Sequence, residues 1–223
     1  MACANETIGS GKSEIRKAQP PVVLDPFCGT GVIPLECLLR GWPVLASDAS
    51  LKAVNGCEKN IEWIRKEYKV AKGATPSAVS KHDATDAFDF TKVKDSSLRR
   101  GPDVVVTETM LGPALNERPT AKDVQQWKSQ AEALEGAFIA NAAATLRGVP
   151  VALMLPVWYL RTGPVFLERV WTAVEKAGYR PVLPPGIGPS APGRTTLLYR
   201  RPDQVVGREI VLLSPAHSAP ARA

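Results

Sequence analysis

The chain has 223 residues, a formal net charge of +6 at pH 7 and an isoelectric point near 9.2. Apolar residues make up 44% and charged residues 22%, which excludes a disordered or fibrous chain and is typical of a globular domain. The longest apolar stretch, residues 149–160, contains two prolines and is shorter than the roughly 20 residues that cross a bilayer. We expect one α/β domain with no membrane segment, and the positive charge favours a polyanionic partner.

The amino-terminal segment, residues 1–20, has no basic stretch followed by an apolar one, so we predict a flexible lead-in and a cytoplasmic protein. Its sequence Gly9-Ser10-Gly11-Lys12-Ser13 is similar to a phosphate-binding loop. However, Glu6 occupies the place of the first glycine and no apolar strand precedes it. Four cysteines without a Cys-x-x-Cys pair, and two histidines, give no reason to predict a metal site.

From residue 21 onward, short apolar runs alternate with amphipathic stretches, which is typical of βαβ units around a mostly parallel sheet. We predict a domain over residues 21–213 and a disordered tail over 214–223. The predicted strands are 22–24, 44–46, 79–82, 103–106, 149–155, 179–183, 195–199 and 209–213, the last ones forming an antiparallel edge. The predicted helices are 32–40, 51–72, 121–147 and 165–177, two of which are closed by a glycine.

Four acidic residues stand where predicted strands end, namely Asp25, Asp48, Asp83 and Glu108. In an open parallel sheet, ligands bind beyond the carboxyl ends of the strands. Carboxylates there can accept hydrogen bonds from the hydroxyls and the exocyclic amine of a nucleoside. One such acid could be a helix cap, but four in register indicate a nucleoside site.

A glycine loop follows the first predicted strand. Gly29 and Gly31 allow a tight turn and a close approach to a ligand, and the next helix offers its first N–H groups. Pro34 occupies the third glycine position of a Gly-x-Gly-x-x-Gly loop, which disfavours NAD. Asp48 follows Asp25 by 23 residues, a separation that suits a carboxylate reaching the ribose of either NAD or S-adenosylmethionine (SAM).

The string Leu24-Asp25-Pro26-Phe27-Cys28-Gly29-Thr30-Gly31 resembles the first motif of the amino-methylating DNA and RNA methyltransferases. From about Pro21 to Leu213, the chain is similar to the tRNA guanine-N2 methyltransferases that usually carry an amino-terminal THUMP RNA-binding domain. The further matching segments are Ser47-Asp48-Ala49, Asn60, Asp83-Ala84, Tyr199-Arg200-Arg201 and Val206-Gly207-Arg208-Glu209-Ile210.

This resemblance implies a Rossmann-like class I methyltransferase fold, with a mostly parallel seven-stranded sheet, an antiparallel edge and SAM as cofactor. The activity it implies is methyl transfer to an exocyclic amino group of guanine in tRNA or another RNA. The cofactor contacts it implies are Asp25, Pro26, Phe27, Cys28, Gly29, Thr30, Gly31, Asp48, Ala49, Asp83, Ala84 and Glu108.

The chain departs from that family after the fourth strand, where the family has Asp-Pro-Pro-Tyr or Asn-Pro-Pro-Tyr. There the acid or amide and a backbone carbonyl hold the target amino group, and the aromatic residue stacks on the base. Aligned through Thr107 and Gly112, this chain reads Glu108-Thr109-Met110-Leu111, which keeps a carboxylate but lacks the prolines and the aromatic residue. We expect Glu108 and Leu111 to form the acceptor site. A small-molecule or protein acceptor, and a non-catalytic SAM-binding partner subunit, stay as alternatives.

The roughly 20 residues before the domain are too few for an RNA-binding domain, so a helper subunit could supply RNA binding. Several arginines could contact phosphates, although scattered arginines are more often solvated or paired. They are Arg99, Arg100, Arg118, Arg161, Arg194, Arg200 and Arg201.

Four further residues invite functional readings that we do not favour. We interpret Cys28 as a small buried residue rather than a nucleophile. His82 is expected to be structural or exposed, because its side chain alternates with that of Asp83. Trp127 and Trp158 are interpreted as packing or interface anchors rather than as residues that stack on a cofactor.

Overall fold

The computed structural model describes residues 19–71, 73–113, 118–190 and 193–216. The glycine-rich sequence at 9–13 and most of the predicted lead-in lie outside the described residues, as does the predicted tail beyond residue 216. Residues 214 and 215, which were expected to belong to that tail, instead continue the last strand.

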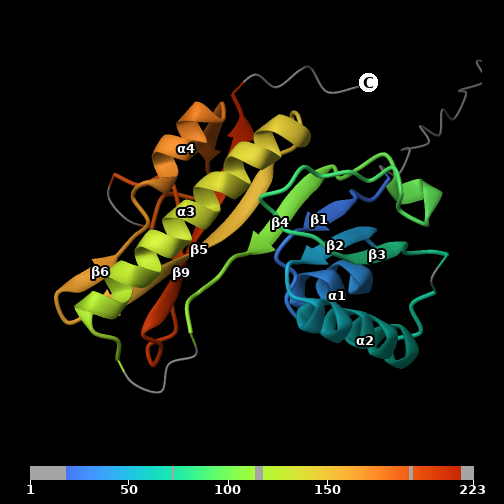
Figure 1. Ribbon diagram of the computed structural model, residues 1–223, viewed down its shortest axis with the longest axis horizontal. Helices are drawn as coiled ribbons and strands as arrows, with labels where there is room; N and C mark the ends of the chain where they lie inside the picture. The colour runs from blue at the N-terminus through green and yellow to red at the C-terminus, as the bar shows by residue number, and fades with distance from the viewer. Residues whose placement is uncertain (1–18, 72, 114–117, 191–192, 217–223) are drawn as a thin grey trace, which may run out of the picture.

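The protein is built on one mixed sheet (Figure 1). Its main path runs β3-β2-β1-β4-β5-β9-β7, with β6 added to β5 and β8 added to β9. Strands β3, β2, β1, β4 and β5 are parallel, whereas β9 is antiparallel to both β5 and β7. The strands are Val23–Asp25 (β1), Val44–Asp48 (β2), Ser77–Lys81 (β3), Val104–Glu108 (β4), Val151–Leu160 (β5), Gly163–Val165 (β6), Tyr179–Val182 (β7), Leu197–Tyr199 (β8) and Val206–Pro215 (β9).

This seven-strand path with an antiparallel edge confirms the predicted Rossmann-like class I methyltransferase fold. Two short strands extend it. Strand β8 corresponds to a predicted strand, whereas β6 was not predicted and shares only Val165 with the predicted helix 165–177.

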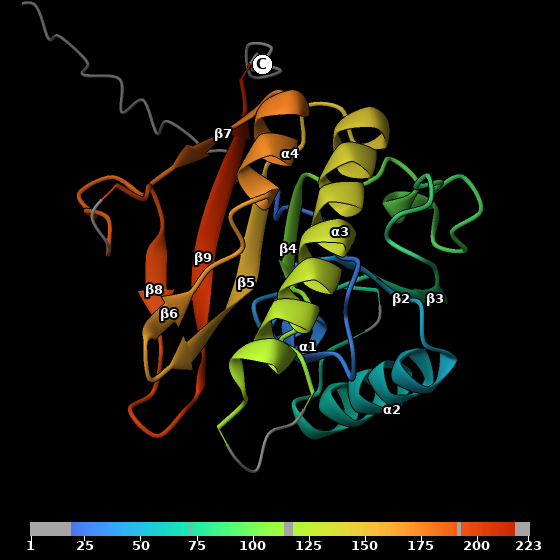
Figure 2. The ribbon, with the colours of Figure 1, turned by 60° about the vertical axis from the view of Figure 1, so that its left-hand side comes forward.

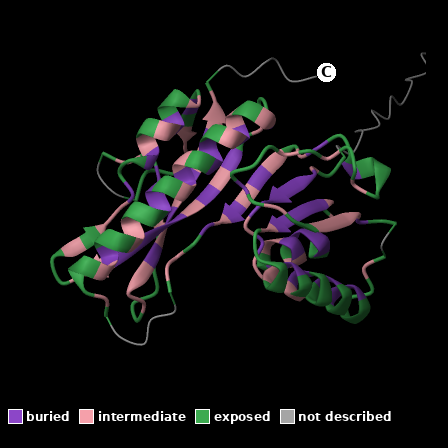
Figure 3. Ribbon diagram, viewed as in Figure 1, coloured by how far each residue is buried: buried purple, intermediate pink, exposed green. Residues whose placement is uncertain are grey.

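Helices cover both faces of the sheet (Figures 1 and 2). Val23 and Val44 of neighbouring strands point to the face covered by α1 (Val32–Leu39) and α2 (Leu51–Glu67). Leu24 and Leu45, one residue later, point to the opposite face, which packs against α3 (Ala121–Thr145) and α4 (Val170–Lys176). The alternation follows from the two-residue period of a strand and explains why these runs are apolar without a break. Figure 3 shows the result as buried central strands beneath helices with exposed outer faces.

Two helix predictions were wrong in their boundaries. The helix predicted to run to residue 72 ends at Glu67, because Lys69 adopts a left-handed backbone with a φ of 53°. Tyr68, which directly follows the last helical residue, is 58% exposed. The helix predicted over 165–177 begins only at Val170, since the Gly163-Pro164 pair turns the chain into a hairpin with β5.

No helix within the described ranges is both long enough and apolar enough to cross a membrane.

Candidate cofactor and acceptor site

The glycine loop lies at the carboxyl ends of β1 and β2 and is held by backbone hydrogen bonds. The Cys28 N–H donates to Ser47 O at 2.9 Å, and the Gly31 N–H donates to Cys28 O at 2.8 Å. The side-chain amide of Asn60, on α2, donates to Thr30 O at 2.8 Å. The loop is therefore tied to its neighbouring strand and helix, and its shape is fixed before any ligand binds.

Asp48 is the central carboxylate of this edge. One oxygen accepts the Gly29 N–H at 3.0 Å, and the other accepts the Ser50 N–H at 2.8 Å. Ser50 in turn caps α2 through the Ala53 N–H. An ionised carboxylate has about four acceptor positions, so each oxygen keeps capacity for one further donor. Ala49, the next residue, is exposed in the same turn.

The two loop glycines meet different constraints. Gly31 has a φ of 99°, and a Cβ there would lie 2.8 Å from Cys57 Sγ, so the close approach to α2 requires glycine. Gly29 has a φ of 52°, and a Cβ there would meet nothing within 4 Å. The loop surface is thus open at Gly29, which is the place where a ligand can approach the backbone.

Asp25 supports the loop from below. It is 1% exposed, accepts the Thr107 hydroxyl at 2.6 Å and accepts the Phe27 N–H at 3.3 Å. Burial raises the pKa of Asp25 to about 7, against the lowering effect of these two hydrogen bonds. The side chain therefore links β1 to β4 and lies beneath the loop. Pro26 is also buried, and Phe27 packs edge-on against Phe138 with ring centroids 5.3 Å apart.

Cys28 is 5% exposed and lies beside Cys57 of α2. The hydrogen bond between the two thiols raises the pKa of Cys28, and burial raises it further. A nucleophilic cysteine needs an accessible thiolate of lowered pKa. Cys28 is accordingly a packing residue in the loop.

The segment after β3 carries Asp83 and Ala84. Asp83 is exposed and accepts both the N–H and the hydroxyl of Thr85, which hold its pKa below the usual range. Ala84 is buried, and its carbonyl accepts the Asn141 side-chain amide at 2.8 Å. His82 contacts Asp86 O and the Phe88 ring. The turn is thus anchored to α3 while Asp83 stays at the surface of the sheet edge.

Glu108 ends β4 and forms an ion pair that the sequence analysis missed. Arg208 of β9 approaches it with Nε 3.1 Å from Oε2 and Nη2 3.4 Å from Oε1. Arg208 had been noted only within a segment matching the family. The strand register identifies the pair, since Glu108 lies opposite Met154 and Met154 opposite Ile210, which is two residues from Arg208 on the same face of β9. Leu111 follows in the half-exposed loop after the strand.

A second buried carboxylate, Glu135 of α3, lies beneath this loop and was also missed. Glu135 is fully buried, and within the described chain neither of its oxygens has a hydrogen-bond partner. Burial raises its pKa to about 7, and the nearby Thr109 hydroxyl, which donates to Met154 O, offsets this only in part. The sequence feature that could have revealed Glu135 is its position on the same face of α3 as the buried Ala131 and Phe138.

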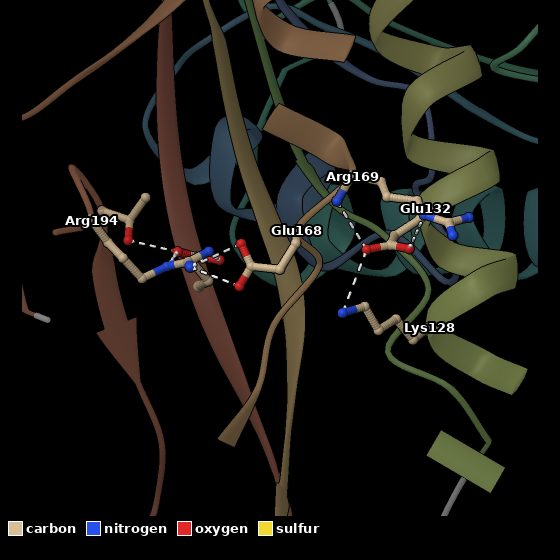
Figure 4. A network of polar contacts seen from close by, with 7 residues as sticks. Lys128, Glu132, Glu168, Arg169 and Arg194 are labelled. Atoms are coloured by element: carbon tan, nitrogen blue, oxygen red, sulfur yellow. Dashed lines mark hydrogen bonds and ion pairs between the residues drawn. The ribbon is translucent and has the colours of Figure 1, made fainter. Parts of the chain in front are cut away.

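Several candidate phosphate-binding arginines are engaged in the structure. Arg194 is paired with Glu168 (Figure 4) and with Glu209. Its guanidinium also lies over the Phe166 ring. It holds together the sheet and the segment before α4, which argues against a phosphate contact. Arg100 pairs with Asp103. The remaining candidates Arg99, Arg118, Arg161, Arg200 and Arg201 are exposed.

Trp158 is fully buried with its ring 6.4 Å from that of Trp127, as expected for packing anchors. Among residues 19–71, 73–113, 118–190 and 193–216, no group of His, Cys, Asp and Glu has the arrangement of a metal site. A large hollow between α3 and α4, lined mainly by alanines, lies away from the carboxyl edge and takes no part in the site.

A family model described as Conserved hypothetical protein 95 matches residues 12–93, well under half of the chain. No curated protein matches the sequence.

Solved structures share the fold at low sequence identity. Sp1610 of Streptococcus pneumoniae, described provisionally as a tRNA (m1A22) methyltransferase, has a TM-score of 0.56 and 13% identity over 92% of this chain and 68% of that chain. Magnesium protoporphyrin IX methyltransferase of Synechocystis PCC 6803, solved with bound SAM, has a TM-score of 0.53 and 14% identity over 87% and 70%. A SAM-dependent methyltransferase of Methanosarcina mazei has a TM-score of 0.53 and 11% identity over 89% and 94%. The chain therefore has the SAM-binding fold of the class I methyltransferases.

Proposed function

We propose that this protein is a SAM-dependent methyltransferase that modifies an exocyclic amino group of guanine in tRNA or another RNA. The observation that carries the proposal is the edge of the sheet where Asp48 braces the glycine loop and Glu108 ends the neighbouring β4. Cofactor and acceptor positions then lie side by side beyond the carboxyl ends of the central strands.

The cofactor half has the chemistry that SAM requires. The two oxygens of Asp48 retain acceptor capacity for a pair of ribose hydroxyls, and the open surface at Gly29 leaves room for close approach. Thr30, Ala49, Asp83 and Glu108 would complete the contacts around this crevice. SAM, when bound, supplies an electrophilic methyl group.

The acceptor half offers one carboxylate, that of Glu108. Its ion pair with Arg208 fixes the carboxylate at the edge of β4, where it can accept a hydrogen bond from an amino group and orient it. Orientation of two bound reactants is itself a large part of the rate enhancement in transfers of this kind. Leu111 would border the acceptor without stacking on it.

An RNA substrate is supported by three observations of different kinds. The motifs resemble those of tRNA guanine-N2 methyltransferases, the net charge of +6 suits a polyanion, and one structural neighbour is described as a tRNA methyltransferase. A helper subunit that supplies additional RNA binding would fit the same proposal.

The proposal is tested by incubating the purified protein with tritiated-methyl SAM and undermodified bulk RNA, DNA or protein extract, followed by nucleoside mass spectrometry. We expect label in the RNA fraction as N2-methylguanosine, and loss of that label in Glu108→Gln with SAM affinity retained. Label in protein or in a small molecule would replace the RNA assignment.

A second candidate is a SAM-binding subunit without methyl transfer. The absence of an aromatic residue in Glu108-Thr109-Met110-Leu111 favours it, since stacking of a base is worth about 1–3 kcal/mol. SAM binding without label in any fraction, with or without added cell extract, would support this candidate.

A further inference from the structure

A small antiparallel sheet projects beyond the carboxyl edge next to Glu108 (Figures 1 and 2). Strand β4 pairs with β5 only as far as Met154, whereas β5 stays paired with β9 as far as Trp158 and then forms the β6 hairpin. Strand β8 adds to the other side of β9. We call residues 155–165 and 197–210 the extension, and the acceptor position lies at its base.

The strand register places an exposed aromatic ring on the same face as Glu108. Tyr199 lies directly opposite Arg208 in the β8–β9 pair, and such partners point to the same face. Arg208 also reaches Glu108, so all three side chains share that face. Tyr199 is 53% exposed. Strand β8 lies three strands from β4, or roughly 14 Å, which suits a base beside the one held at Glu108.

The opposite face of the same strand tip carries a fixed guanidinium. The guanidinium carbon of Arg200 lies 4.0 Å from the centroid of the Tyr159 ring, a cation–π distance. Gly207 makes this stack possible, because a Cβ there would lie 2.9 Å from Tyr159 Cε2 and 3.2 Å from Arg200 Cβ. The end of the extension therefore holds the exposed Arg200 guanidinium in one position.

The charges of the extension are mostly positive. Three arginines, Arg161, Arg200 and Arg201, are exposed on it, against the single exposed carboxylate of Asp203. Glu209 adds no net charge, since it is buried against Arg194. Exposed tyrosine between arginines is the combination with which proteins bind unpaired nucleotides, by stacking on bases and neutralising phosphates.

We propose that the extension binds a single-stranded segment of RNA that passes over the tip of its strands. A base flanking the target nucleotide stacks on Tyr199, and phosphates along the segment are held by Arg161 and Arg201 and, on the opposite face, by Arg200. The choice of RNA rests on the proposed function. In this arrangement Tyr199 supplies an aromatic surface near the acceptor position, where Leu111 offers none.

The test is fluorescence anisotropy with a labelled single-stranded RNA of about 12 nucleotides, without SAM, at salt concentrations between about 50 and 200 mM. Tyr199→Leu is expected to weaken binding by about 5- to 100-fold, and Tyr199→Phe to retain it, because phenylalanine keeps the stacking face. The double variant Arg200→Ala/Arg201→Ala is expected to lower the slope of log affinity against log salt by about 1.4.

Two matched controls separate the extension from general surface effects. Tyr68→Leu removes a tyrosine of similar exposure at the end of α2, and Arg147→Ala removes an exposed arginine beyond the carboxyl end of α3. Both should bind RNA like the wild type. The proposal is overturned if the wild type does not bind single-stranded RNA at low salt, or if Tyr199→Leu and Tyr68→Leu bind equally well.

The RNA-binding proposal and the proposed methyltransferase function can be contradicted independently of each other. If RNA is methylated while Tyr199→Leu binds like the wild type, the extension is not the binding surface and the proposed function stands. If RNA binding depends on Tyr199 but no RNA is methylated, the surface stands and the proposed function fails.

Discussion

The two halves of the candidate site are built in different ways. On the cofactor side, Asp48 is fixed by backbone N–H groups, one of them 19 residues away and the other two residues away. On the acceptor side, Glu108 is fixed by the side chain of Arg208, 100 residues away. The first arrangement is a local property of a loop and a helix start, whereas the second exists only when β4, β5 and β9 align.

The buried carboxylates show the same contrast. Asp25, at the cofactor side, has a hydroxyl and a backbone N–H as partners, whereas Glu135, under the acceptor loop, has no partner for either oxygen within the described residues. The buried carboxylate of the cofactor side thus has hydrogen-bond partners, whereas the buried carboxylate of the acceptor side has none. The contrast concerns the carboxylates alone, because the Ser47 hydroxyl on the cofactor side is also buried without a partner among the described residues. Each prediction below tests one part of this contrast.

The largest change in the free energy of unfolding is expected for Glu135→Gln. Its pKa of about 7 in the folded protein lies above that of an unfolded glutamate, so the stability that its neutral form provides is lost as pH rises toward 7. Glutamine cannot ionise, and the variant should become more stable than the wild type by about 3 kcal/mol at pH 8, with little difference at pH 4.

Urea unfolding at several pH values measures this difference. Glu62→Gln, on the exposed side of α2, should keep the pH dependence of the wild type. If the free energies of unfolding of Glu135→Gln and the wild type depend on pH in the same way, ionisation of Glu135 does not destabilise the folded protein. The description of the acceptor side would then be wrong.

Asp48→Ala tests the cofactor half. The variant removes the brace on Gly29 and, in the proposed function, the charge-assisted hydrogen bonds to the ribose, so SAM affinity should fall by about 100-fold, or 2.7 kcal/mol. Titration calorimetry gives the affinity, and circular dichroism checks the fold. Asp203→Asn, in the exposed loop before β9, serves as the control. A loss below about 3-fold would remove Asp48 from the proposed contacts.

Thr107→Val tests the hydrogen bond that joins β4, on the acceptor side, to Asp25 of β1, on the cofactor side. Without the Thr107 hydroxyl, the buried Asp25 carboxylate loses its shortest hydrogen bond, and its pKa rises further above 7. The variant should lose about 2 kcal/mol at pH 8 and less at pH 5, where Asp25 is protonated in either case. Thermal unfolding at the two pH values, beside Thr172→Val on the exposed side of α4, checks the sign. A loss that is greater at pH 5 would contradict this account.

The smallest change in stability is expected for Arg208→Gln. The pair with Glu108 is partly exposed, with side-chain exposures of 22% and 36%, so its loss should cost less than about 1 kcal/mol. Because Arg208 positions Glu108, kcat for RNA should fall while KM changes less. Steady-state kinetics beside thermal unfolding separates the two effects, and an unchanged kcat would remove Arg208 from the acceptor site.

The contrast also explains what the sequence could predict. The positions and the ends of β1, β2 and β4 follow from short apolar runs that each end at an acidic residue. The order of the strands in the sheet was not predicted from these runs. Asp48 was predicted as a carboxylate at the end of its strand that reaches a ribose, whereas its hydrogen bond with the Gly29 N–H was not predicted.

The pairs that were missed join distant elements. Arg208 reaches Glu108 across β5, and Arg194 reaches Glu209 and Glu168 from a loop between β7 and β8. Neither pair can be recognised until the register of β9 is known. Strand β6 was missed for a related reason, because only its pairing with β5 identifies these three residues as a strand.

The central claim is that the edge beyond β1 and β2 holds SAM, and calorimetry on the wild-type protein tests it most directly. The account predicts saturable binding of one SAM per chain, competition by S-adenosylhomocysteine and no measurable binding of NAD. Saturable binding of NAD in place of SAM, or no binding of either, would contradict it.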